Sequence, residues 1–112
     1  MRVLMIDDIR KFDTEYICRF YQFKRGDTIR IARTCKQGIE MLKNRGPWDL
    51  LLLDHDLGLA DPLKKELNGY YVMCWLEQAN PCYLPKQIKI ISSNPVGNRR
   101  MQQVIDKLYA RD

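Results

Sequence analysis

Four consecutive leucines, Leu50-Leu51-Leu52-Leu53, run directly into the polar residues Asp54-His55-Asp56. A short continuous apolar run is typical of a strand that is covered on both faces, as in a parallel sheet. A second run, Val3-Leu4-Met5-Ile6, has the same character and ends on Asp7-Asp8. The two runs therefore predict two buried strands, each followed at its carboxyl end by carboxylates.

Strand patterns alternate with helical patterns along the chain. Two further strands are expected at 28–32 and 88–91. Apolar residues recur at helical spacing over 9–23, 69–76 and 101–108, and Ile39, Met41 and Leu42 mark a further helix that ends at Gly46-Pro47. This alternation predicts an α/β fold with right-handed crossovers. We expect a flavodoxin-like three-layer sandwich whose four parallel strands follow the order 2-1-3-4, which places the ligand site between the first and third strands.

The composition fits one globular domain. The chain has 112 residues, of which 46% are hydrophobic and 29% are charged. These values argue against disorder, and we expect residues 1–112 to form one domain with a single core. No apolar run is long enough for a secretory signal or a membrane-spanning helix, so a cytoplasmic protein is expected.

The cysteines and the basic residues each allow a structural and a functional interpretation. Cys18, Cys35, Cys74 and Cys82 form no CxxC pair and are interpreted as buried reduced thiols, which fits the cytosol. The formal net charge is +5, which is compatible with an anionic partner. Many of the cations, interleaved with aromatic residues, lie in the N-terminal half: Arg2, Arg10, Lys11, Arg19, Phe20, Tyr21, Phe23, Lys24, Arg25, Arg30, Arg33, Lys36, Lys43 and Arg45. This half is either a nucleic-acid contact surface or a solvated face over core aromatics.

Acidic residues follow both central strands. If these strands are neighbours, about 4.8 Å apart, then Asp7, Asp8, Asp54 and Asp56 crowd one edge of the sheet. Carboxylates so close together resist joint ionisation unless a cation neutralises them. Oxygen ligands suit Mg²⁺, or Mn²⁺ in its place. The alternative is that these acids only cap helices or face solvent.

A polar loop follows the fourth expected strand, with Ser92, Ser93 and Asn94 before the last helix. Hydroxyl groups and backbone N–H groups near a helix start can hold a phosphate. Arg99 and Arg100 are placed in the first turn of that helix, where positive charge is unfavourable unless an anion binds. The alternative is an ordinary turn with two solvated arginines.

The chain resembles the response-regulator receiver domain, and within it the cyclic-phosphate-processing receiver-like family. The motifs that carry the resemblance are Asp7-Asp8, Leu53-Asp54-His55-Asp56-Leu57-Gly58, Asn68-Gly69-Tyr70 with Trp75-Leu76, and Ser92-Ser93-Asn94-Pro95-Val96-Gly97. The resemblance implies that the acidic pair holds Mg²⁺ and that Asp54 matches the phosphoryl-acceptor aspartate. It also implies that Asp56 offers a backbone carbonyl to the metal and that Ser92 or Ser93 takes the hydroxyl position.

The chain departs from signalling receivers at two places. It ends after the fourth helix, so the fifth strand and helix are missing, and with them the lysine that contacts the phosphoryl group. His55 follows Asp54 where receivers have an apolar residue. As the only histidine, His55 is either a general acid or base or a brace for the loop, since adjacent residues of an extended chain point in opposite directions.

These features favour a metal-dependent phosphoesterase that acts on cyclic phosphates of nucleotides or RNA ends. In it, Asp54, His55 and Asp56 carry the chemistry, and Ser92, Ser93, Asn94 and Arg99 hold the phosphate. Three alternatives stay open: a phospho-accepting or pseudo-receiver module without activity, a haloacid-dehalogenase-like phosphatase suggested by Asp54-x-Asp56, and a nucleic-acid-binding module. The long connection 57–68 predicts a lid or a packing loop, and the exposed fourth strand makes an oligomer plausible.

Overall fold

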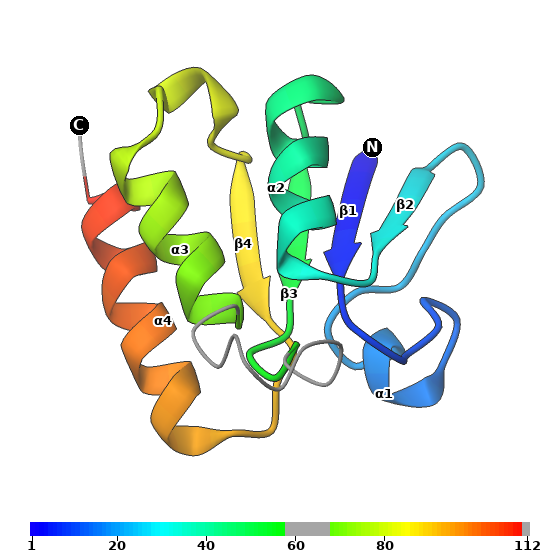
Figure 1. Ribbon diagram of the computed structural model, residues 1–112. Coiled ribbons are helices and arrows are strands. Elements are labelled where there is room, and N and C mark those ends of the chain that lie inside the picture. Colours follow the sequence, from blue (N-terminus) through cyan, green and yellow to red (C-terminus); the bar gives the residue numbers. More distant parts are fainter. Residues whose placement is uncertain (58–67, 111–112) are drawn as a thin grey trace.

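A computed structural model describes residues 1–57 and 68–110 of the chain, and its centre is one parallel sheet (Figure 1). The strands are β1 (Arg2–Ile6), β2 (Thr28–Ala32), β3 (Leu50–Leu53) and β4 (Gln87–Ile90). Their order is β2-β1-β3-β4 and every pair is parallel. The expected fold class and strand order are therefore confirmed, and β1 and β3 are neighbours.

Each α-helix begins at a polar side chain that accepts a hydrogen bond from a backbone N–H three residues on. The helices are α1 (Glu15–Cys18), α2 (Cys35–Asn44), α3 (Gly69–Gln78) and α4 (Pro95–Tyr109), with the short 3-10 helix η2 (Pro81–Tyr83) before β4. The capping residues are Thr14, Thr34, Asn68 and Asn94. Such caps satisfy a backbone donor that the helix itself leaves unpaired.

The two faces of the sheet are covered differently. Alternate strand residues such as Leu4, Leu51 and Ile88 pack with buried residues of α2, α3 and α4. In Figure 1, α2 and α3 lie in front of the sheet with α4 beside them. The opposite alternation, which includes Met5 and Leu52, packs mainly against α1 and the aromatic residues around it. All four leucines of β3 are almost fully buried because both faces are covered.

The expectation of a helix across residues 9–23 is wrong, because α1 has only four residues. Asp7 ends the strand with a turn in which its carboxylate accepts from the backbone N–H groups of Ile9 and Arg10. Ile9 is 71% exposed and lies six residues before the start of α1 at Glu15, so the apolar spacing began before the helix does. The aromatic residues of this segment do belong to the core: Phe12, Tyr16, Phe20, Tyr21 and Phe23.

The cysteines correct another expectation. All four are free, but only Cys35 is buried, whereas Cys18 and Cys82 are exposed and Cys74 is half-buried. Burial raises the pKa of the Cys35 thiol to about 11. No helix in the described part of the chain has both the length and the apolar character needed to cross a membrane. Residues 58–67, where the lid is expected, lie outside the described residues.

Candidate functional site

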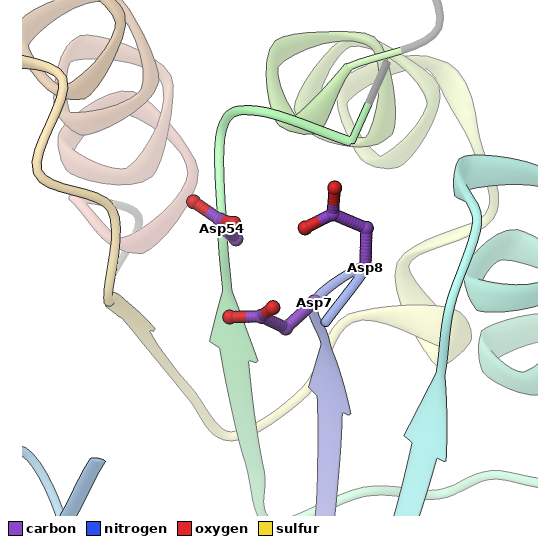
Figure 2. A group of neighbouring side chains, drawn as sticks. All are labelled: Asp7, Asp8 and Asp54. Carbon is purple, nitrogen blue, oxygen red and sulfur yellow. The ribbon is translucent and has the colours of Figure 1, made fainter. Parts of the chain in front are cut away.

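The strand register brings the acidic residues together. Ile6 pairs with Leu53, so the next residue of each strand, Asp7 and Asp54, emerges at the same edge of the sheet. The Asp54 backbone N–H continues the ladder by donating to the Ile6 carbonyl at 3.0 Å. Figure 2 shows Asp7 and Asp54 at the ends of β1 and β3, with Asp8 on the segment that follows β1. One carboxylate oxygen from each residue lies within 4.8 Å of the other two.

Burial disfavours the ionised form of the carboxylates in this cluster. Asp7 is fully buried and Asp54 is 5% exposed, whereas Asp8 is half-buried. Burial raises the pKa of Asp54 to about 6, and the Asp7 carboxylate acts in the same direction. Burial also raises the pKa of Asp8. A set of three carboxylates, two of them buried, offers only oxygen ligands and fits a hard divalent cation such as Mg²⁺ or Mn²⁺.

Arg10 is a site residue that the sequence analysis counted only among the surface cations. Its Nη1 donates to Asp7 Oδ2 at 2.9 Å and lies 3.4 Å from Asp54 Oδ2. The guanidinium therefore bridges the two buried carboxylates. The local signal was the position of the arginine three residues after Asp7, inside the turn that the Asp7 carboxylate closes. The contact with Asp54, however, spans 44 residues and has no local signature.

The His55 ring contacts Asp56 and the start of α4. Its Nδ1 lies 2.9 Å from Asp56 Oδ1 and 3.4 Å from the Asn94 amide nitrogen. Its Nε2 is buried without a hydrogen-bond partner within the described residues. The ring thus lies between the end of β3 and the start of α4, which favours the bracing interpretation.

Asp56 points toward solvent and toward α4. Its side chain is 65% exposed, and its Oδ1 accepts from the Asn94 amide at 3.4 Å as well as contacting His55. The His55 hydrogen bond lowers the pKa of Asp56. Among the described residues, the carboxylates close enough to share a cation are those of Asp7, Asp8 and Asp54. The Asp56 side chain is outside that group.

Two glycines bring α3 and α4 against this edge of the sheet. A Cβ atom at Gly69 would lie 2.1 Å from the Asp54 carbonyl oxygen, and the Gly69 backbone N–H donates to the His55 carbonyl at 2.8 Å. A Cβ atom at Gly97 would lie 2.3 Å from Cδ2 of the His55 ring. Only glycine allows either approach. The sequence analysis noted both residues within motifs but gave them no role.

Several polar groups of the loop after β4 form hydrogen bonds within the loop itself. Ser92 is buried, and its Oγ accepts from the Asn94 backbone N–H at 3.0 Å. Asn94 caps α4 by accepting from Gly97 N–H, while Ser93 and Arg99 are exposed. Helix α4 begins at Pro95, so the placement of Arg99 and Arg100 in its first turn is wrong. They lie in the second turn, and the unfavourable charge at the helix start disappears as an argument for an anion.

Known proteins were compared with the chain at the levels of sequence and structure. A family model described as the cyclic-phosphate processing receiver domain matches residues 2–107. No curated protein matches the chain. A solved fusion protein that carries the yeast Spc42 trimeric coiled coil, amino acids 181–211, is similar with a TM-score of 0.62 and 23% identity. That similarity covers 93% of this chain and 63% of the other, and it concerns the fold alone. By its match to the family model, the chain belongs to the cyclic-phosphate processing receiver domain family.

Proposed function

We propose that the protein is a metal-dependent phosphoesterase that opens cyclic phosphates on nucleotides or RNA ends. The observation that carries the proposal is the cluster of Asp7, Asp8 and Asp54, whose carboxylate oxygens lie within 4.8 Å of one another. Membership of a cyclic-phosphate processing family supports the substrate class. In the reaction, a water oxygen bonds to phosphorus, one ring P–O bond breaks, and the released ribose oxygen takes a proton.

The three carboxylates would hold Mg²⁺ or Mn²⁺. A bound divalent cation stabilises charge on the phosphate oxygens and lowers the pKa of a coordinated water. Asp7 is fixed by the backbone N–H groups of Ile9 and Arg10, so it is the rigid member of the set. Asp54, with its pKa raised to about 6, ionises fully once positive charge is close.

Proton transfer falls to Asp56 in this proposal, with His55 as its support. Asp56 is exposed beside the cluster, and His55 and Asn94 restrict its Oδ1. The Asp56 carboxylate would accept the proton of the attacking water as a weak base, because the His55 hydrogen bond lowers its pKa. Ser93 and Arg99, which are exposed, would hold the phosphate together with Asn94, while Ser92 shapes the turn.

The test is incubation of the purified protein with nucleoside 2′,3′-cyclic monophosphates and with RNA that ends in a cyclic phosphate. Phosphate monoester formation is followed by ³¹P NMR or chromatography, with Mg²⁺, with Mn²⁺ and with a chelator. We expect cation-dependent turnover that Asp54→Ala abolishes. Turnover that is equal in Asp54→Ala, or no turnover of any of these substrates, contradicts the proposal.

A non-catalytic phospho-accepting module is separated by one further measurement. Acetyl phosphate treatment followed by mass spectrometry would reveal a stable phosphoryl adduct on Asp54 in that case. A phosphoesterase leaves the mass unchanged.

The proposed setting is the reducing cytoplasm, because all four cysteines are free. The partner is a cyclic phosphate carried by a nucleotide or an RNA end, with the basic N-terminal half as the RNA contact. The outer edge of β4, which pairs with β3 on its other side, is the surface through which two copies would associate.

A further inference from the structure

Arg10 holds a defined position over the carboxylate cluster. One nitrogen, Nη1, makes both of its contacts with Asp7 and Asp54, at 2.9 and 3.4 Å. Among the described residues, Nε and Nη2 donate to no acceptor. A guanidinium carries five N–H donors in a planar arrangement, so most of this donor set stays available. The side chain is 27% exposed, so the group lies at the boundary between the buried acids and solvent.

Other residues fix Arg10 from two sides. Its guanidinium stacks over the Tyr16 ring, 4.4 Å from the ring centroid, and the Tyr16 hydroxyl donates to the Ile91 carbonyl. Its backbone carbonyl accepts from Arg33 Nη1 at 2.6 Å, and the same nitrogen reaches the Asp7 carbonyl. The ring is thereby tied to the end of β4 and the backbone to the end of β2. Arg10 is therefore held in place at both its side chain and its backbone.

The two carboxylate contacts are unequal. The bond to Asp7 has ordinary length for a charged pair, whereas 3.4 Å to Asp54 is long. If the carboxylate cluster held a divalent cation, Asp54 would no longer depend on Arg10 for its counter-charge, and Arg10 would keep its shorter contact with Asp7. The Nε and Nη2 groups of Arg10 would then be available to bind a phosphate. A planar pair of N–H donors matches two oxygens of a phosphate.

We propose that Arg10 is a phosphate-binding residue of this site, which bridges Asp7 and Asp54 in the absence of a cation and binds the phosphate of the substrate when a cation is present. The inference rests on the proposed function for the identity of the substrate. It adds Arg10 to the site residues that were predicted from the sequence, and it gives Arg10 one contact without a cation and another with a cation.

The test compares the wild-type chain with Arg10→Gln and Arg10→Lys in two separate titrations. The first measures Mn²⁺ affinity from the EPR signal of the free ion. The second measures the affinity of inorganic phosphate by calorimetry at saturating Mg²⁺. We expect Arg10→Gln to weaken phosphate binding by at least about tenfold while Mn²⁺ affinity stays equal or rises, because a competing cation has been removed. Arg10→Lys keeps the charge but loses the planar donor pair, so its phosphate affinity should lie between those of the wild type and Arg10→Gln.

Arg100→Gln is the matched control. Arg100 also stacks on a tyrosine, 4.1 Å from the Tyr70 ring centroid, but no described aspartate pairs with it. Phosphate and Mn²⁺ affinity should both be unchanged in this variant. Equal phosphate affinity in wild type and Arg10→Gln overturns the proposal, and so does a parallel loss of Mn²⁺ affinity, which indicates a collapsed site. If Arg10→Gln does not fold, the phosphate affinity and the Mn²⁺ affinity of Arg10→Lys decide the question in the same way.

The two proposals fail separately. A protein that binds inorganic phosphate through Arg10 but turns over no cyclic phosphate contradicts the proposed function and leaves the role of Arg10 intact. If the protein turns over cyclic phosphates but Arg10→Gln leaves the phosphate affinity unchanged, the proposed function stands and the role of Arg10 is contradicted.

Discussion

Asp54 is the residue at which burial and charge oppose each other most strongly. Its folded-state pKa of about 6 lies above the ordinary value of 3.8, so the folded protein holds this proton more tightly than the unfolded chain. Stability from this residue is therefore greatest below the unfolded pKa and is lost as the pH rises through about 4 to 6. Above that window the Asp54 charge destabilises the fold, because the distant contact with Arg10 offsets its burial only in part.

Asp54→Asn should therefore stabilise the metal-free protein at neutral pH, by up to about 3 kcal/mol. The variant removes the buried charge and should flatten the dependence of unfolding free energy on pH between about 4 and 6. Denaturant unfolding in a chelating buffer across this range measures both effects. A variant less stable than wild type at neutral pH contradicts the assignment.

Asp56→Asn is the control, because its effect on the free energy of unfolding should have the opposite sign to that of Asp54→Asn. The hydrogen bond from His55 lowers the pKa of Asp56, so its contribution is present above the unfolded pKa and is lost as the pH falls. The variant should lower stability slightly at neutral pH and have no effect in strong acid. Because Asp56 is largely exposed, the change should be small compared with that at Asp54.

At the scale of the element, strands were easier to predict than their connections. The apolar runs at 3–6 and 50–53 predicted β1 and β3 because burial on both faces leaves no room for polar residues. Apolar spacing failed over residues 9–23, since aromatic residues on an irregular loop reach the core at intervals that mimic a helix. It also missed the first turn of α4, where the residues Pro95 to Asn98 have no periodic apolar pattern.

The site residues also divide into those that the sequence could predict and those that it could not. Asp7, Asp8 and Asp54 could be predicted because the order of strands alone places the ends of β1 and β3 together. Arg10 and the two contact glycines could not, because their roles depend on distances between segments that are far apart in sequence. Gly97, for example, acts through His55, which precedes it by a whole β–α unit.

The docking of α4 on His55 gives a prediction at this scale. In an open helix, Gly97→Ala would be favourable by up to about 1 kcal/mol. Here the added methyl group would lie 2.3 Å from the His55 ring, so the variant should instead be destabilised by about 1–3 kcal/mol. Denaturant unfolding of the single variants and of the His55→Ala/Gly97→Ala double variant measures the coupling.

In the His55→Ala background the methyl group has room, and Gly97→Ala should be neutral or stabilising. Gly69→Ala is the contrasting case, because its Cβ would meet the Asp54 backbone carbonyl at 2.1 Å, which side-chain truncation cannot relieve. Equal destabilisation by Gly97→Ala in both backgrounds would show that the ring contact is not the cause.

At the scale of the whole molecule, the four thiols report on how completely the chain is folded. Cys18 and Cys82 are exposed, Cys74 is half-buried, and Cys35 is buried in the core with its pKa raised to about 11. A thiol reagent such as DTNB should therefore modify Cys18 and Cys82 rapidly and Cys74 slowly. Cys35 should react only on global unfolding, because the thiolate is the reactive form. Mass spectrometry of timed digests assigns each site, and rapid labelling of Cys35 under native conditions would contradict this packing.

A divalent cation should stabilise the entire domain, because it binds a cluster that exists only when β1 and β3 are paired. A ligand at 100 times its dissociation constant adds about 2.7 kcal/mol to the free energy of unfolding. For a domain of this size, that corresponds to a rise in Tm of roughly 10 °C or more. The rise should be larger at pH values above the Asp54 pKa of about 6 than below it, because protonated Asp54 is a poor ligand.

Thermal unfolding with increasing Mg²⁺ or Mn²⁺, at one pH on each side of that value, measures the effect. Asp8→Asn should reduce the Tm shift because it removes one of the three oxygen ligands. Asp106→Asn is the control, because Asp106 is exposed on α4 and, within the described part of the chain, accepts from Gln102 alone. It should leave the Tm shift unchanged. An equal shift in Asp8→Asn and wild type would place the cation elsewhere on the molecule. No shift with either cation would mean that Arg10, rather than a metal, is the permanent counter-ion of the buried carboxylates.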